Sequence, residues 1–426
     1  MAAIPLFVNQ IIDQTLEFFG ATWFLWAPIV LYFVFWETWV AYVRANFISN
    51  LKWMLLEIKI PKEVAKSPKA MENFLAGIHG SGKGGNLLEK YWDGWLTPWF
   101  SLEIVGDRTG VHFYIWCQKF FKRMIESQVY AQYPASEIKE VEDYTRDVPS
   151  LPVEGWNMWG TEFILTKPDA YPIRTYEDFP IEDISAKEEE RKIDPLSSLI
   201  EYFGTLRNSE RLWLQIVIQP MGDKWKKEGE ALVAKLAGKE VKPPTPPFVI
   251  RMIGVFFDTV ATLLGLPTAA SSKKQENQFR MLNMSPGEIN TIKAIENNIT
   301  KFGLETGIRW MYIAKKEDYN TLSIPSMFGI FRQFSSQTLN GFKPNGERTT
   351  SADYFFVNTR VNMRKNWLFN AYQLRSFFHP PYKSDTIVLS STELATIYHF
   401  PGMVAGAPSM ERIEAKRGAP PPNLPV

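Results

Sequence analysis

The sequence predicts an α+β protein in which one transmembrane helix precedes two split α/β lobes. Three observations predict this class. Nineteen consecutive residues, 18–36, carry no charge. Strand-like and helix-like segments then follow in the order β-α-β-β-α-β over residues 53–141, which is the ferredoxin-like, split βαβ plan. A similar alternation over residues 156–315 indicates the second lobe.

The uncharged run reads FFGATWFLWAPIVLYFVFW and lies between Glu17 and Glu37. A helix rises about 1.5 Å per residue, so a run of this length comes close to crossing the roughly 30 Å hydrocarbon core of a bilayer. Pro28 would kink the helix, which membrane helices tolerate better than soluble ones. Aromatic rings favour the membrane interface. We therefore expect membrane contacts from Phe18, Trp23, Trp26, Tyr32 and Trp36.

The charges around this run predict its orientation. No Lys or Arg precedes Arg44 and no A-x-A pattern follows the run, so a cleaved secretory signal is not indicated. Four cations follow it, and the positive-inside rule then places the bulk of the chain in the cytoplasm; they are Arg44, Lys52, Lys59 and Lys62. The single cysteine, Cys117, fits a reducing compartment. We predict a single-pass protein of the inner (cytoplasmic) membrane; an interfacial or packed helix is the alternative.

Breaker residues and shifts in composition divide the chain into five parts. We expect an amphipathic segment over 1–17, a transmembrane helix over 18–43, a ferredoxin-like domain over 50–146, a second lobe over 154–402 with a helical insertion over 222–285, and a proline-rich tail over 403–426. The apolar stretch 248–266 carries Arg251 and Asp258, which disfavour a second span. Whether it lies on the membrane or packs in the core is left open.

The elements of the two lobes follow from apolar alternation, caps and breakers. Ser285 precedes Pro286 and is followed by Glu288, which predicts a capping box at a helix start. Predicted strands cover 53–60, 99–105, 111–117, 137–141, 156–166, 211–219 and 305–314. Predicted helices cover 67–76, 119–133, 194–206, 222–236, 286–302, 325–339, 353–378 and 392–398.

A basic and aromatic region, 342–379, is the candidate interaction site. The net charge of +1 argues against a chain-wide attraction to nucleic acid, but not against a local patch. Cations beside stacking rings suit single-stranded nucleic acid, although the same pattern serves a helix that docks on a protein or lies on a membrane, and such rings are also core residues. The candidate contacts are Lys343, Arg348, Arg360, Arg364, Lys365, Trp367, Tyr372 and Arg375, near Tyr354, Phe355 and Phe356.

Motifs for catalysis are weak. Residues 77–84 match G-x-x-x-x-G-K, but Gly84 stands where a phosphate loop needs Ser or Thr for Mg²⁺, and the loop follows a predicted helix instead of a strand. None of the histidines, His79, His112, His379 and His399, pairs at metal-ligand spacing. We therefore predict no enzymatic activity, with no catalytic, cofactor-binding or metal-binding residues.

Five stretches resemble a bacterial family that is similar to the N-terminal, non-catalytic region of type IV secretion (conjugation) ATPases. They are WMLLEIKIPKEVAKSPKAMENFLAG (53–77), SQVYAQYPASEIKEVEDYT (127–145), LWLQIVIQPMGDKWKKEGEALVAKLAG (212–238), FGIFRQFSSQTLNGFKPN (328–345) and STELATIYHFPG (391–402). In that family a motor domain follows this region, whereas here the chain continues into GAPPPNLPV.

The resemblance implies a membrane-anchored scaffold component of a type IV secretion-like apparatus, without the motor. Its implied partners are membrane lipid and other subunits of the apparatus, among them a separate motor ATPase, and self-association is left open. The alternative is a membrane-tethered nucleic-acid-binding module that uses residues 342–379.

Overall fold

The computed structural model describes residues 13–14, 17, 20–60, 67–82, 84–178, 194–207, 209–238 and 284–401. They form two compact units, residues 1–53 with 83–98 and residues 54–82 with 99–426. The stretch 248–266, the tail 403–426 and most of the segment 1–17 lie outside the described residues. The predicted boundaries of the parts stay a prediction.

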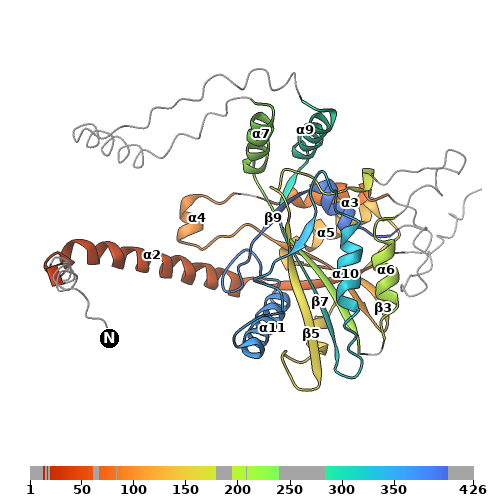
Figure 1. The fold of residues 1–426 in the computed structure, drawn as a ribbon, viewed down its shortest axis with the longest axis horizontal. Helices are drawn as coiled ribbons and strands as arrows, with labels where there is room; N and C mark the ends of the chain where they lie inside the picture. Colours follow the sequence, from red (N-terminus) through yellow and green to blue (C-terminus); the bar gives the residue numbers. More distant parts are fainter. Residues whose placement is uncertain are drawn as a thin grey trace, which may run out of the picture. The chain divides into compact units, whose positions relative to one another are not determined.

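The first unit contains the apolar helix. Helix α2 spans Trp23–Asn50, with Pro28 inside it (Figure 1). Its buried residues are Val40 and Val43. Among the described residues it is the one helix long and apolar enough to cross a membrane. A short helix, α4 (Leu87–Tyr91), belongs to the same unit and begins with a capping box formed by Asn86 and Glu89.

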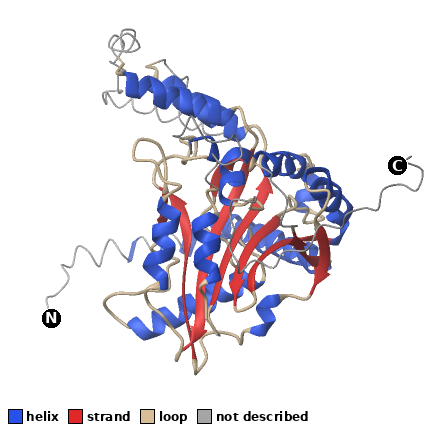
Figure 2. Cartoon of the chain, turned by 90° about the vertical axis from the view of Figure 1, so that its right-hand side faces the viewer, coloured by secondary structure: helices blue, strands red, loops and turns tan. Residues whose placement is uncertain are grey.

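The second unit is built on a nine-stranded sheet (Figure 2). The strand order is β4-β1-β3-β2-β6-β7-β5-β8, and β9 pairs with β7 beside β5. The strands are β1 (Trp53–Lys59), β2 (Phe100–Asp107), β3 (Gly110–Gln118), β4 (Glu137–Val141), β5 (Trp156–Leu165), β6 (Arg211–Pro220), β7 (Gly303–Lys315), β8 (Phe342–Pro344) and β9 (Ile387–Ser390).

Both halves of this sheet have the same topology, which confirms the predicted fold class. Counted outward from the centre, the order is second, third, first and fourth strand in each half, β2-β3-β1-β4 and β6-β7-β5-β8. The halves join where β2 and β6 pair antiparallel, with Glu103 opposite Gln215 at the midpoint. In a separate lobe β2 and β6 would each be an exposed edge, so their pairing removes two edges that could template aggregation.

Five helices contribute side chains to one apolar core on a single face of the sheet (Figure 1). They are α3 (Lys69–His79), α5 (Lys122–Gln132), α6 (Ser197–Gly204), α10 (Ser323–Arg332) and α12 (Ser391–Ile397). Fully buried residues such as Phe74 of α3 and Phe203 of α6 belong to the same core cluster as the alternate residues Leu102 and Leu214 of the central strands. Helix α11 (Val357–Gln373) covers the other face, where Leu368 meets Gly160 of β5.

A helical pair separates β6 from β7. Helices α7 (Lys224–Leu236) and α9 (Pro286–Ile299) pack closely at Gly229. A Cβ atom at this position would come within 2.3 Å of the Ile299 side chain. The predicted capping box of Ser285 and Glu288 starts α9, as the sequence indicates. Like α7, α9 lies between β6 and β7 in the sequence.

Several boundaries differ from the prediction for tertiary reasons. Helix α3 continues through Gly77 to His79, whose ring bonds the carbonyl of Met221 at 2.9 Å. Helix α10 ends at Arg332, seven residues early. Strands β8 and β9 were not predicted, since three or four residues carry too little alternation and their partners lie far away in the sequence.

Candidate functional site

A row of polar residues crosses the face of the sheet that α11 covers. The residues lie directly opposite one another on β3, β2, β6, β7 and β5. All are buried, Glu103, Gln215 and Arg309 completely. They are Tyr114, Glu103, Gln215, Arg309 and Glu162. Because burying an unpaired charge is costly, such a row is stable only if each charged group is bonded.

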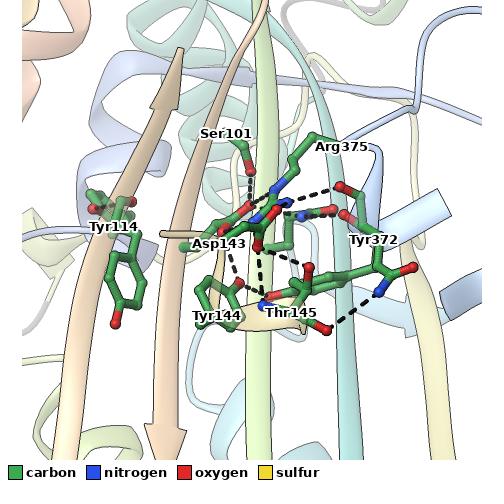
Figure 3. Close-up of polar contacts among 11 residues, drawn as sticks. Ser101, Tyr114, Asp143, Tyr144, Thr145, Tyr372 and Arg375 are labelled. Atoms are coloured by element: carbon green, nitrogen blue, oxygen red, sulfur yellow. Dashed lines mark hydrogen bonds and ion pairs between the residues drawn. The ribbon is translucent and has the colours of Figure 1, made fainter. Parts of the chain in front are cut away.

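Arg375 closes the first half of this row (Figure 3). Its Nε donates to Glu103 Oε1 at 3.0 Å, and its Nη2 donates to Asp143 Oδ1 at 3.0 Å. Its Nη1 donates to the carbonyl of Gln373 at 2.8 Å and to Asp143. The guanidinium is fully buried and uses all three nitrogens. It ties β2 to the end of α11 and to the 3₁₀ turn η2 (Tyr144–Asp147) that follows Asp143.

Further donors complete the shell around Glu103. Ser101 Oγ and the Tyr144 hydroxyl each donate to its carboxylate at 2.7 Å, and Gln215 Nε2 donates at 2.8 Å. Burial acts to raise the pKa of Asp143, but Arg375 and the Thr145 bonds outweigh it and hold that pKa below its usual range. The carboxylate of Glu103 and the guanidinium of Arg375 are bonded at every oxygen and nitrogen, whereas the buried Oε1 of Gln215 has no hydrogen-bond partner among the described residues. The bonds to the two charged groups favour one arrangement of the elements they join.

A second ion pair stands in the other half of the row. Arg309 Nη2 lies 3.1 Å from Glu162 Oε1 and donates to the carbonyl of Ser376 at 2.8 Å. Its guanidinium lies 4.5 Å from the centre of the Phe377 ring. Burial is the largest influence on both groups, lowering the pKa of Arg309 and raising that of Glu162. This pair fastens the segment that follows α11 onto β7 and β5.

The His112 ring lies between a hydroxyl and a carboxylate, an arrangement that can activate a hydroxyl group. Its Nδ1 lies 2.8 Å from Glu57 Oε1, and its Nε2 lies 2.8 Å from Thr109 Oγ1 and 3.7 Å from Asp107. Burial lowers the pKa of His112, but hydrogen bonds and charge from Asp107 and Glu57 outweigh it and raise the pKa to about 9. The ring is therefore charged at neutral pH and does not take a proton from Thr109.

Other groups offer little chemistry. Burial is the largest cause that raises the pKa of Cys117 to about 12, so the reactive thiolate is not populated at neutral pH. Across the described ranges, no group of three or more His, Cys, Asp and Glu residues could hold a metal ion. The glycine motif begins inside α3, which ends at His79, whereas a phosphate loop follows a strand and opens a helix.

Two of the residues predicted as contacts do not lie on the surface, so the prediction is wrong for them. Tyr372 and Arg375 are completely buried. The Tyr372 ring stacks on Trp213 with centres 5.3 Å apart, and Arg375 belongs to the buried network. The last turn of α11 faces the sheet, which the helix-period pattern of the sequence alone could not orient.

The other predicted cations mostly hold their own segment. Arg348 lies 4.1 Å from the centre of the Trp367 ring, and Lys365 Nζ donates to Asn157 at 2.7 Å. Arg364 donates to the carbonyls of Thr349 at 3.0 Å and of Ser351, and Arg360 donates to the carbonyl of Asp353 at 2.9 Å. Arg360 and Arg364 thus bond the chain that leads into α11, whereas Lys365 bonds β5. Lys343 is exposed on β8.

The chain so fixed presents an exposed aromatic loop, Tyr354–Phe356. Its three side chains are 89%, 82% and 82% exposed. Tyr354 and Phe356 have left-handed backbone, with φ of 69° and 54°. The sequence predicted a helix from 353, but α11 begins at Val357. Left-handed conformations cost about 1–2 kcal/mol for residues with a Cβ, so an aromatic loop of this kind is stabilised by its surroundings.

The predicted anchor residues differ in their surroundings. Trp23, Trp26 and Tyr32 are exposed on α2, whereas Trp36 packs on Tyr91 with ring centres 5.3 Å apart. Phe18 lies outside the described residues.

Fold and site together define an α+β protein whose described residues contain one candidate membrane-spanning helix, a doubled split βαβ sheet and a buried ionic network. The chain belongs to the family described as a domain of unknown function (DUF8128), which matches residues 46–411. The comparison with curated proteins gave no match.

Proposed function

We propose that this protein is a membrane-anchored, non-catalytic docking subunit. In this proposal α2 crosses the inner membrane, the doubled sheet lies in the cytoplasm as a rigid platform, and the loop Tyr354–Phe356 contacts a partner protein. The setting is the type IV secretion-like apparatus that the sequence resemblance implies, and the partner is a separate motor ATPase.

The exposed aromatic loop is the observation that carries this proposal. Three adjacent rings more than 80% exposed leave a large apolar area in water, and aromatic side chains dominate the energetics of protein interfaces. Arg360 and Arg364 restrain the flanking chain, so little conformational entropy would be lost when a partner binds. The buried ion pairs in turn fix the far end of α11.

Site-specific crosslinking in intact membranes tests the docking role. A photoreactive phenylalanine analogue is placed at Phe355 and, as a matched control, at Phe120, which is 88% exposed on another part of the same unit. We expect an adduct with a motor ATPase from position 355 and none from position 120. Equal labelling from both positions, or no adduct from 355, would contradict the proposal.

A loop variant provides the second arm of that experiment. Tyr354→Asn/Phe355→Ser/Phe356→Asn removes the rings, while Asn tolerates left-handed backbone. We expect the variant to reach the membrane at the wild-type level but to lose co-purification of the ATPase, whereas Phe120→Ser retains it. Loss in both variants would point to a general defect and not to the loop.

The nucleic-acid alternative has narrower support, namely the exposed cations Lys343 and Arg360. Tyr372 and Arg375 are buried, and Arg364 and Lys365 hold internal oxygen atoms. A mobility-shift titration of single-stranded DNA separates the two functions. Binding that weakens with salt and with Lys343→Glu/Arg360→Glu would favour the nucleic-acid module, since phosphate contacts release counterions.

A further inference from the structure

Residues 84–98 form a small structure that packs on the end of the apolar helix. They belong to the same compact unit as α2. Trp39 Nε1 donates to the carbonyl of Tyr91 at 2.9 Å, and the rings of Trp39 and Trp92 lie 5.3 Å apart. Gly94 has a φ of +72°, and a Cβ there would come within 2.3 Å of the Val43 carbonyl oxygen. Glycine thus allows the loop backbone to lie directly against α2.

The position of these contacts along α2 is informative. They run from Trp36, the last residue of the uncharged stretch, to Val43. Nineteen residues, the length of the uncharged stretch, would span about 28 Å in a helix, so the contacts lie where such a span would leave the hydrocarbon core. Trp36, Trp39, Tyr91 and Trp92 bring four amphipathic rings to this level. Such rings are enriched at the boundary between lipid and water.

The same small structure also exposes apolar side chains. Leu87, Leu88 and Trp92 are 73%, 75% and 69% exposed. The capping box of Asn86 and Glu89, with both bonds at 2.8 Å, gives α4 a defined helical form. The neighbouring charges, Glu89, Lys90 and Asp93, do not add up to a basic patch. Attraction to anionic headgroups therefore does not explain the exposure.

We propose that residues 84–98 are an interfacial foot that inserts Leu87, Leu88 and Trp92 into the cytoplasmic leaflet beside α2. This inference rests on the proposed membrane anchoring and adds a second contact with the same membrane. Its occupant is the boundary between headgroups and acyl chains, because the foot is continuous with the end of the span. The foot would limit the depth and rotation of α2.

Depth-dependent quenching in the full chain tests the foot. The protein is reconstituted in phosphatidylcholine vesicles with an environment-sensitive fluorophore on a cysteine at Leu88, at Leu31 in α2, or at Phe120 as the water-exposed control. Cys117 can remain, because its thiol is buried. We expect quenching by a shallow spin-labelled lipid to be at least about threefold stronger at position 88 than at 120, and unchanged by adding anionic lipid.

A glycine pair shows whether packing on α2 positions the foot. Gly94→Ala places a Cβ against the Val43 backbone, whereas Gly84→Ala meets nothing within 4 Å. We expect Gly94→Ala to abolish quenching at position 88 and to leave it at position 31, while Gly84→Ala changes neither.

The outcomes separate the two proposals. Quenching at 31 with a water-like label at 88 overturns the foot and leaves the anchor. An apolar but unquenched label at 88 indicates contact with protein and also overturns the foot. Absence of quenching at 31 as well as 88 overturns the membrane anchoring on which the foot depends.

Discussion

The two faces of the central sheet are built by different physics from alternate residues of the same strands. Leu102 and Leu214 face the helices α3, α5, α6, α10 and α12 in a continuous apolar core. Their neighbours Glu103 and Gln215 face α11 in a fully buried polar network. The apolar face is stabilised by the hydrophobic effect, which has no preferred direction. The polar face is held by bonds of fixed geometry, which specify the position of α11 and its flanking loops.

The two faces of the sheet differ in how they respond to a change of side chain. Non-directional packing tolerates changes of side chain if volume is kept. A buried ion pair tolerates no loss of a partner, because the remaining charge is left without compensation. We therefore expect the polar face to determine the presentation of the aromatic loop, and the apolar face to supply most of the general stability.

Removal of Arg375 is the largest expected effect. Arg375→Met leaves the buried Glu103 and the part-buried Asp143 without their cation, so we expect the free energy of unfolding to fall by about 3–5 kcal/mol. Urea unfolding of the detergent-solubilised protein measures it. The double variant Glu103→Gln/Arg375→Met is the matched control and should lose clearly less than the sum of the single losses. An additive double variant would show that the two groups are not coupled.

Truncation on the apolar face comes next. Leu102→Ala, one residue from Glu103 on β2, should lower the free energy of unfolding by about 2–5 kcal/mol through the cavity it leaves. Leu102→Met should lose less than about 1.5 kcal/mol. The same urea experiment applies. If Leu102→Met were as harmful as Leu102→Ala, this face would depend on specific geometry after all, and the contrast between the faces would disappear.

A pH titration probes the polar face through His112. Its pKa is raised to about 9 in the folded protein from the ordinary 6.5. The stabilisation is complete below about pH 6.5 and is lost as the pH rises through 9, and we expect a loss of about 1–2 kcal/mol, discounted for partial exposure. His112→Gln should flatten the stability profile between pH 6.5 and 9. An unchanged slope in that variant would mean that another group titrates.

Relief of strain in the aromatic loop is the smallest effect. Phe356→Gly replaces a left-handed residue by one that adopts this conformation freely, although glycine adds entropy to the unfolded chain. We expect a gain of roughly 0.5 kcal/mol in the free energy of unfolding, together with weaker binding of the partner. Gly222→Ala, where an added Cβ meets nothing within 4 Å, is a comparison that isolates the unfolded-chain term, a gain of about 0.4–1 kcal/mol. A loss above about 1 kcal/mol would mean that the Phe356 ring stabilises the platform.

Much of the fold could be read from local signals. The strands 137–141 and 211–219 and the capping box at Ser285 agree with β4, β6 and α9 closely, because alternation and caps are properties of neighbouring residues. The split βαβ order also appears directly in the sequence of elements. By contrast β8 and β9 are too short to carry a pattern and exist through pairing with β5 and β7.

Only part of the candidate site could be predicted from the sequence. The sequence marked the basic and aromatic region 342–379, but a helical pattern could not separate Tyr372 and Arg375, which are buried, from Tyr354–Phe356, which are exposed. That division depends on where α11 begins and on the bonds of Arg360 and Arg364 to backbone carbonyls. The foot on α2 was likewise not predicted, because its contacts join residues about fifty positions apart.

By itself the sequence determined the uncharged helix and the order of strands and helices, since both arise from composition and from the spacing of apolar residues along a short stretch of chain. The tertiary structure decided which polar residues became buried partners and which rings stayed outside. The physical reason is that a charge such as Glu103 is stable in the interior only when Arg375, far away in the sequence, is brought within hydrogen-bonding distance by the completed sheet.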